Sequence, residues 1–352
     1  MGTMHQIQGE PVKDEAQRVT IYPIAGVAGP WEDEPFDEST LPTTIVPDIT
    51  VENVTPLFKS GTWSWVEGEI GKRDLEVLKQ VKHAIVHRYF SRQYGAGDME
   101  QQSANIVHNL AACLRLIRPM RQFALMMNGP LQADGTISIQ SFNHPIHLME
   151  IPHIQKGFSL RNRDVAEFQS FAPNFLDAMT GEYWKFRMPV SLYEAGHFQD
   201  RFWKNRFFLW SSAIEALFTS QTPDREHSGS KVAKARVKWF LGATTKIYAP
   251  GDVPSFMPQL EPEPTIADVI DDIYEVRNCI AHGDKVPDKF FAQTSTGYEN
   301  INRIATLEEA ASFIVRASLL KILKDRLLHH FKGGPESQLY FNANNLIRSK
   351  LP

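Results

Sequence analysis

The segment Arg277-Asn278-Cys279-Ile280-Ala281-His282 carries a guanidinium, an amide and an imidazole at the end of an otherwise apolar helical pattern. An imidazole can take the proton of an RNA 2′-hydroxyl, and a guanidinium can hold the phosphate while charge develops on it. A metal-independent ribonuclease needs these two groups. Five residues turn an ideal helix by about 140°, so Arg277 and His282 do not share a face by spacing alone. The alternative is a surface arginine followed by a histidine that caps the helix.

Glu215 interrupts the most apolar helical pattern of the chain, residues 198–218. A buried carboxylate needs a partner, and Arg277 and Arg206 are the candidates. Glu215 then either orients the Arg277 guanidinium or forms a purely structural ion pair. Four basic side chains on the next predicted helix either follow a phosphate backbone or form a solvated face, namely Lys231, Lys234, Arg236 and Lys238.

Two histidine groups fail as metal sites, and the sequence predicts no metal or cofactor. The group at 144, 147, 150 and 153 recurs at three-residue steps, which alternate faces on an extended strand. His83 and His87 share a helical face, but they lack the glutamate of an HExxH motif and a third ligand.

Two cysteines, Cys113 and Cys279, are too few for a disulfide framework and are predicted as core residues. Walker A, GxGxxG and GxSxG motifs are absent, which leaves kinases, dinucleotide enzymes and α/β-hydrolases unsupported.

The elements that must position Arg277 and His282 are helices. Residues 198–218 are apolar on nearly every face, which is typical of a helix at the centre of a bundle. Residues 230–241 are amphipathic, and Thr265-Ile266-Ala267-Asp268 opens a helix that should stop at Gly283. A second capping box, Thr306-Leu307-Glu308-Glu309, predicts the start of a long helix. Five prolines between residues 249 and 264 indicate a loop insertion.

The N-terminal half has a different pattern. Residues 1–60 are predicted to be an acidic, Pro-rich arm with a strand at 19–24, and residues 61–190 an α+β domain. Within them, helices are expected over 73–89, over 98–117 up to Pro119, and over 164–179, and a hairpin over 136–151. Residues 1–50 carry a local charge of −7, which leaves +3 on the rest of a chain of net charge −4. That balance is compatible with a nucleic-acid groove.

Residues 195–332 resemble the HEPN superfamily, and in particular its ApeA-like branch. The resemblance depends on Arg277, Asn278 and His282, on the Glu-bearing apolar segment 207–218, and on segments 230–241 and 273–283 following in order. It implies a bundle of four or five helices over residues 191–335 that usually dimerises. It also implies that His282 is the acid/base, Arg277 the phosphate clamp and Asn278 a positioning amide, and that cleavage needs no metal and leaves a 2′,3′-cyclic phosphate.

We therefore expect a mainly α, cytoplasmic protein that acts as a metal-independent endoribonuclease at a homodimer cleft. Family context suggests a role in stress or phage defence. Many HEPN domains only bind RNA or nucleotide, or only dimerise, so a non-catalytic module is the first alternative. A small-ligand sensor that uses the N-terminal domain is the second. No signal peptide or membrane span is visible, and residues 336–352 are expected to be a tail.

Overall fold

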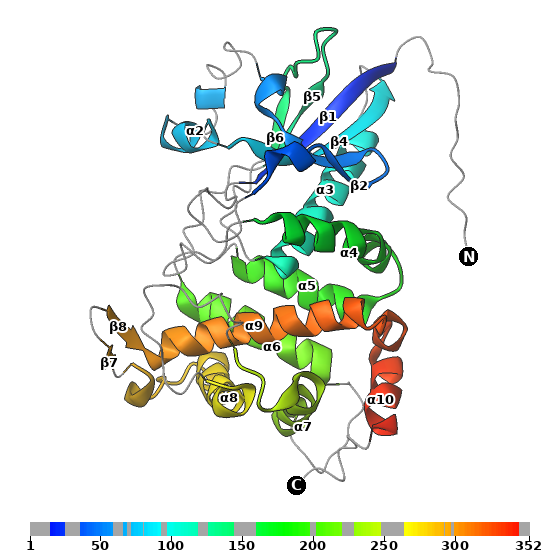
Figure 1. The fold of residues 1–352 in the computed structure, drawn as a ribbon. Coiled ribbons are helices and arrows are strands. Elements are labelled where there is room, and N and C mark those ends of the chain that lie inside the picture. The colour runs from blue at the N-terminus through cyan, green and yellow to red at the C-terminus, as the bar shows by residue number, and fades with distance from the viewer. Residues whose placement is uncertain are drawn as a thin grey trace.

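The computed structural model describes residues 15–24, 36–58, 66–68, 72–79, 81–92, 97–118, 126–143, 160–197, 202–219, 229–247, 264–291, 293–296 and 299–344. These residues are mostly helical, with an antiparallel sheet in the N-terminal part and a helical region in the C-terminal part. Figure 1 shows the sheet at one end of the molecule and the helices stacked below it. Among the described helices, none has the length and apolar character needed to cross a bilayer.

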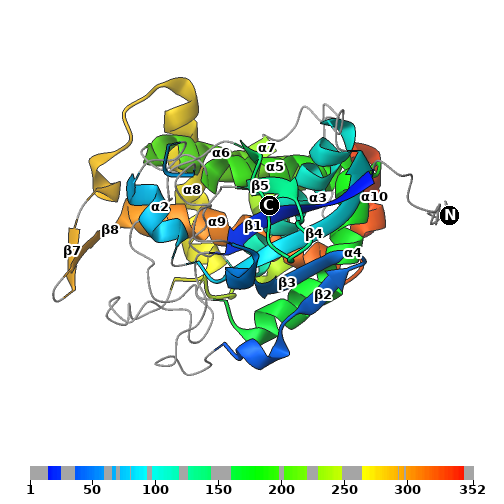
Figure 2. The same ribbon diagram turned by 90° about the horizontal axis from the view of Figure 1, so that it is seen from above.

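Six antiparallel strands form the N-terminal sheet in the order β2-β3-β4-β1-β5-β6. Figure 2 shows the neighbouring strands β2, β3, β4 and β1 from above. Their bounds are β1 (Glu15–Ile24), β2 (Thr43–Val46), β3 (Ile49–Asn53), β4 (His83–Arg92), β5 (Met126–Pro130) and β6 (Ser141–Asn143). The central strands β1 and β4 pair over their whole length, from Glu15 opposite Arg92 to Ile24 opposite His83. The strand predicted at 19–24 is thus confirmed and extends to Glu15.

The helix predicted over 73–89 is wrong in its second half. Residues Lys72–Leu78 form α2, but the chain then turns and continues as β4. The run His83-Ala84-Ile85-Val86 fits a helical stripe as well as a buried strand. The segment is a strand because β1 and β3 pair with it on both sides. Neither of these strands is close to β4 in sequence, so a local pattern does not contain their contribution.

Two other N-terminal predictions need correction. The described part of residues 1–60 is not a separate arm, because it supplies β1, β2 and β3 of the sheet. The segment 141–143, expected as the connection of a hairpin, is itself strand β6 and pairs with β5. The second half of that hairpin, residues 145–151, lies outside the described residues, as does the start of the chain up to residue 14.

Side chains alternate along each strand, so each face of the sheet carries its own set of apolar side chains. Both faces are covered by a helix. Helix α3 (Gly97–Ile117) packs on the face that carries Tyr22 and Ile85, as the prediction of a helix over 98–117 anticipated. On the other face, Val19 and Ile21 pack against Leu75 and Leu78 of α2.

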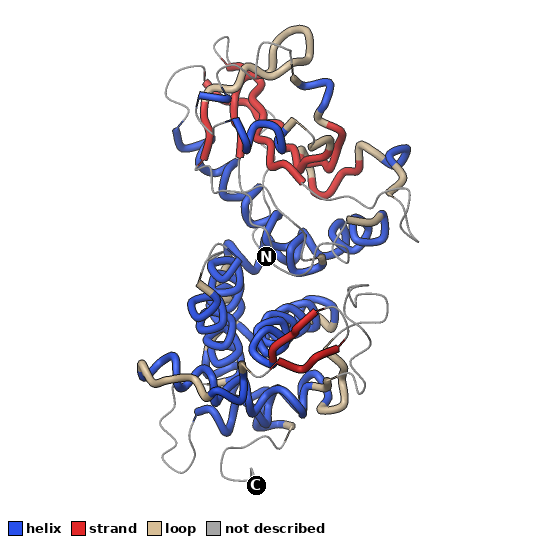
Figure 3. The backbone as a smooth tube through the Cα atoms, turned by 90° about the vertical axis from the view of Figure 1, so that its left-hand side faces the viewer, coloured by secondary structure: helices blue, strands red, loops and turns tan. Residues whose placement is uncertain are grey.

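The C-terminal region is built of seven further helices in the described part of the chain, shown in Figure 3 below the sheet. Their bounds are α4 (Asn162–Thr180), α5 (Trp184–His197), α6 (Trp203–Phe218), α7 (Gly229–Val237), α8 (Ile266–His282), α9 (Arg303–Lys324) and α10 (Gly334–Ala343). Helix α6 contacts α5, α7, α8 and α9, so it lies in the middle of this region. A two-stranded hairpin, β7 (Gln293–Thr296) and β8 (Glu299–Asn302), precedes α9.

Most C-terminal helix predictions are confirmed, with shifts at the ends. The helix over 164–179 exists as α4 and includes Pro173, and the segment 230–241 forms α7 followed by a π-helical turn. The long helix starts at Arg303 rather than at Thr306, which is buried. The first part of the expected C-terminal tail belongs to α10, which begins at Gly334 and whose Phe341 is fully buried. The Pro-rich insertion falls outside the described residues except for Pro264.

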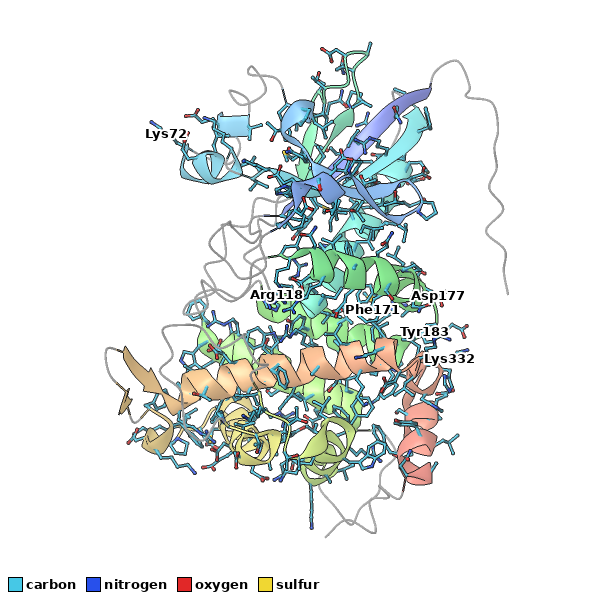
Figure 4. The ribbon with its side chains drawn as sticks, in the orientation of Figure 1. Lys72, Arg118, Phe171, Asp177, Tyr183 and Lys332 are labelled. Carbon is cyan, nitrogen blue, oxygen red and sulfur yellow. The ribbon has the colours of Figure 1, made fainter. Side chains whose placement is uncertain are left out.

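A buried polar network joins the sheet to the helical region. The Arg115 guanidinium on α3 forms an ion pair with Glu194 on α5 and donates to the Tyr22 hydroxyl on β1 at 2.9 Å. All three side chains are at least 90% buried. Figure 4 labels Arg118, where the end of α3 meets α4 and α5, and its Nε lies 3.9 Å from the Asp164 carboxylate. Burial in a low dielectric makes these charges costly unless they stay paired.

Replacing Glu194 with alanine should destabilise the protein by about 3–5 kcal/mol, because the Arg115 charge is then buried without its partner. Chemical denaturation at neutral pH measures the free energy of unfolding. The matched control is Asp288→Ala, which breaks the exposed ion pair with Lys285 and should cost less than about 0.5 kcal/mol. Equal losses in both variants would contradict a special role for the buried pair.

Helix α5 packs closely on α6, so a larger side chain at Gly196 should lower the stability of the protein. A Cβ atom added at Gly196 would lie 2.3 Å from Nε1 of Trp210, whose indole donates to the Tyr193 carbonyl at 3.1 Å. Gly196→Ala should therefore cost about 1–3 kcal/mol through overpacking. Gly334→Ala, which meets no atom within 4 Å, is the control. Thermal melting of both variants tests this, and an unchanged melting temperature for Gly196→Ala would refute it.

Candidate functional site

Helix α8 has the two ends that its sequence predicts. At the start, the Asp268 carboxylate accepts from the Thr265 backbone N–H at 2.8 Å. At the end, Gly283 adopts φ 74°, a left-handed conformation that glycine reaches without strain. The Asp284 N–H then donates to the Cys279 carbonyl at 2.8 Å, which closes the helix one residue after His282. The last two turns of α8 therefore carry Arg277, Asn278 and His282, as expected.

Arg277 is half-buried between α8 and α6. Its Nη2 donates to the Glu215 carboxylate in an ion pair, and its Nη1 donates to Oδ1 of Asn278 at 3.1 Å. The guanidinium carbon also lies 5.9 Å from the centroid of the Phe208 ring. The Arg277 side chain keeps 21% of its surface exposed, so its cation is anchored but accessible from solvent.

Glu215 is the acidic centre of this site. Of its two expected partners, it pairs with Arg277, while Arg206 pairs with Glu308 on α9. The other carboxylate oxygen of Glu215 faces the amino end of α7, where a Cβ added at Gly229 would lie 3.5 Å from it. The positive end of the α7 dipole favours a negative charge at this place.

Tyr274 is a member of this site that sequence reasoning missed. Its side chain is 2% exposed, and its hydroxyl has no hydrogen-bond partner among the described residues. Burial raises the pKa of Tyr274, the Glu215 carboxylate raises it further, and the Arg277 guanidinium lowers it, so both charges act on the phenol. Its position three residues before Arg277 could have indicated it in the sequence, because this spacing puts both residues on one face of a helix.

His282 lies apart from Arg277 in the single chain. It is exposed at the last position of α8, and no hydrogen bond joins it to Arg277 in the part of the chain that the structure describes. The helical spacing anticipated this separation. Asn278 and Glu215 are thus brought to Arg277, and the imidazole is not.

The four basic residues predicted to bind RNA do not form one surface. The prediction that Arg236 contacts RNA is wrong, because this residue is fully buried. Its guanidinium donates to the Phe218 carbonyl at 2.8 Å and to Gln338 at 2.9 Å. Its helix buries this position against α6 and α10, where the guanidinium carbon lies 4.5 Å from the centroid of the Phe341 ring. Lys234 and Lys238 both pair with Asp271 on α8, and Lys231 is exposed.

Two buried cations close the carboxyl end of α6. Beside Arg236, the Lys185 amine on α5 donates to the Thr219 carbonyl. Cations are favourable at the negative end of a helix dipole. Burial and, to a smaller extent, the nearby Arg236 charge together lower the pKa of Lys185 to about 8. Lys185 and Arg236 therefore have a structural role at the carboxyl end of α6. The carbonyl that Lys185 contacts belongs to Thr219, four residues beyond Glu215.

The histidines of the N-terminal half do not form a metal site within the described residues. His83 and His87 lie on β4 rather than on a helix; the Nε2 of His83 is 3.6 Å from Glu38, and the Nδ1 of His87 is 2.8 Å from the Ser103 hydroxyl. Burial lowers the pKa of both imidazoles. The group from 144 to 153 lies outside the described residues. Cys113 is buried and Cys279 partly buried, and both are free thiols.

Comparisons with protein-family models, with curated proteins and with solved structures find no match to this chain.

Lys185 makes stability depend on pH in a defined direction. Its folded pKa of about 8 is below the ordinary 10.5, so between these values the unfolded chain binds more protons. Wild-type stability, measured relative to Lys185→Met, should therefore rise from pH 8 to pH 10.5 and be flat below pH 7. Urea unfolding of both proteins at matched pH values measures the difference. Parallel curves would show that Lys185 titrates normally.

Proposed function

We propose that this protein is a metal-independent endoribonuclease whose site is the carboxyl end of α8, from Arg277 to His282. Arg277 holds the scissile phosphate, and His282 transfers the proton of the 2′-hydroxyl. The observation that carries the proposal is the state of Arg277: an anchored, partly exposed guanidinium on the same helix end as an exposed imidazole. A guanidinium at this place is within reach of a phosphate from solvent, and its N–H donors can stabilise the charge that develops on the phosphate oxygens.

We further propose that the helical region is a HEPN-like bundle and acts as a homodimer. In one chain, Arg277 and His282 do not contact each other, so a second copy that faces the end of α8 would complete the cleft. The proposed RNA contacts are limited to Arg277, Asn278, His282 and the exposed Lys231. Lys234 and Lys238 share Asp271, which reduces the positive charge they offer to a phosphate.

The test is RNA cleavage by the purified protein with and without EDTA. His282→Ala and Arg277→Ala should each lower the rate about 100-fold or more, because the first removes the acid/base and the second the phosphate clamp. EDTA should leave the wild-type rate unchanged, and the products should end in a 2′,3′-cyclic phosphate. His329→Ala, which removes an exposed histidine after α9, is the matched control and should keep full activity.

Each other outcome has a defined meaning. Cleavage that EDTA abolishes would contradict the proposal, and so would equal activity in the wild type and both site variants. Binding of RNA without cleavage would favour the alternative of a non-catalytic RNA-binding module. One observation favours that alternative: the Arg277 charge is already compensated by Glu215. Light scattering of the same samples tests the expected dimer.

A further inference from the structure

We propose that Tyr274 is a positioning residue, which receives the Glu215 carboxylate when Arg277 turns to bind a phosphate group. The inference rests on the proposed function in one respect, since it takes a phosphodiester as the ligand of Arg277. It adds a resting state, in which Glu215 occupies the guanidinium, and a binding state, in which the Tyr274 hydroxyl holds Glu215 instead.

Two donors at this site are unused. Nε of Arg277 and the Tyr274 hydroxyl are both buried without a hydrogen-bond partner in the described part of the chain. Leaving a buried polar group unpaired costs free energy, and native structures keep few such groups. Both donors are on one face of α8, three residues apart. Arg277 contacts the Glu215 carboxylate on α6, and the charges of that ion pair act on the Tyr274 phenol. Their neighbourhood is therefore a hydrogen-bond network that is only partly formed.

The Glu215 carboxylate has the capacity to complete that network. An ionised carboxylate can accept about four hydrogen bonds, and among the described residues one donor, Nη2 of Arg277, reaches it. Its second oxygen faces the amino end of α7, which stabilises the negative charge whether or not Arg277 stays bound. The carboxylate can consequently release the guanidinium, provided that another donor replaces it.

The resting ion pair opposes binding of a second anion. A phosphate that approaches Arg277 meets a guanidinium already neutralised, and the Glu215 charge repels it. Rotation of the partly exposed Arg277 toward solvent would remove both obstacles. It would also leave Glu215 without its cation, unless the Tyr274 hydroxyl donates to it. This exchange moves no proton: one hydrogen bond to Glu215 breaks and another forms.

A double-mutant cycle with a non-cleavable ligand tests this exchange. The ligand is a 2′-O-methyl RNA decamer, which keeps the phosphates and lacks the 2′-hydroxyl needed for cleavage. Tyr274→Phe should weaken binding about tenfold, the value of one hydrogen bond to a charged group. Glu215→Gln should strengthen binding several-fold, because the competing charge is gone. In the Glu215→Gln background, Tyr274→Phe should have no further effect.

Controls separate this role from a structural one. Tyr193→Phe removes the same atom from another fully buried tyrosine, on α5, and should leave binding unchanged. Tyr274→Phe should melt at or above the wild-type temperature, because the hydroxyl it removes is unpaired in the resting state. A loss of binding that accompanies a loss of folding would overturn the proposal.

The remaining outcomes distinguish this inference from the proposed function. Decamer binding that follows the cycle, without cleavage of ordinary RNA, would support the exchange and refute the nuclease. Cleavage that depends on Arg277 and His282 but is unaffected by Tyr274→Phe would support the nuclease and refute the exchange. Equal effects of Tyr274→Phe with and without the Glu215 carboxylate overturn the exchange. So does a wild type that binds no decamer, because Arg277 then takes no phosphate.

Discussion

The C-terminal region depends on the neutralisation of one carboxylate. Helix α6 contacts four other helices and buries mainly apolar side chains, yet Glu215 lies on it with limited exposure. A carboxylate in that position has to be compensated, and α8 provides the cation through Arg277. The pairing links the carboxyl-terminal part of α8 to the carboxyl-terminal half of α6, and thereby sets which way Arg277 points. The same contact that stabilises the helix pair also lowers the charge that the site presents to a ligand.

A second polar network lies where the two parts of the molecule meet. One apolar core runs from the sheet into the C-terminal helices. Within it, Arg115 lies between Tyr22 of the sheet and Glu194 of α5. A buried ion pair adds little net stability compared with apolar packing, although it penalises any arrangement that separates the charges. Helix α5 packs on α6 so closely that a Cβ at Gly196 would clash with Trp210. The sheet is therefore connected to the helix that holds Glu215 by contacts that tolerate little displacement.

The success of sequence prediction varied with the range of the interactions involved. Helices α3, α4 and α8 were predictable because their apolar periodicity and caps are local, and the capping box at Thr265 and the glycine at 283 appear as expected. Strand β4 was not, because its residues fit a helical stripe equally well. Its partners β1 and β3 are far away in sequence, so pairing energy that no local pattern contains decided the outcome.

The candidate site shows the same division. By itself, the sequence determined that α8 ends at His282, that Arg277 and His282 are on different faces, and that Glu215 needs a cation; each follows from helix geometry or from the cost of an unpaired buried charge. Only the tertiary structure decided which arginine pairs with Glu215, that Arg236 is directed inward, and that Tyr274 is buried with an unpaired hydroxyl. The physical reason is that side-chain direction and charge pairing depend on how α6, α7 and α8 pack, and packing joins residues that are distant along the chain.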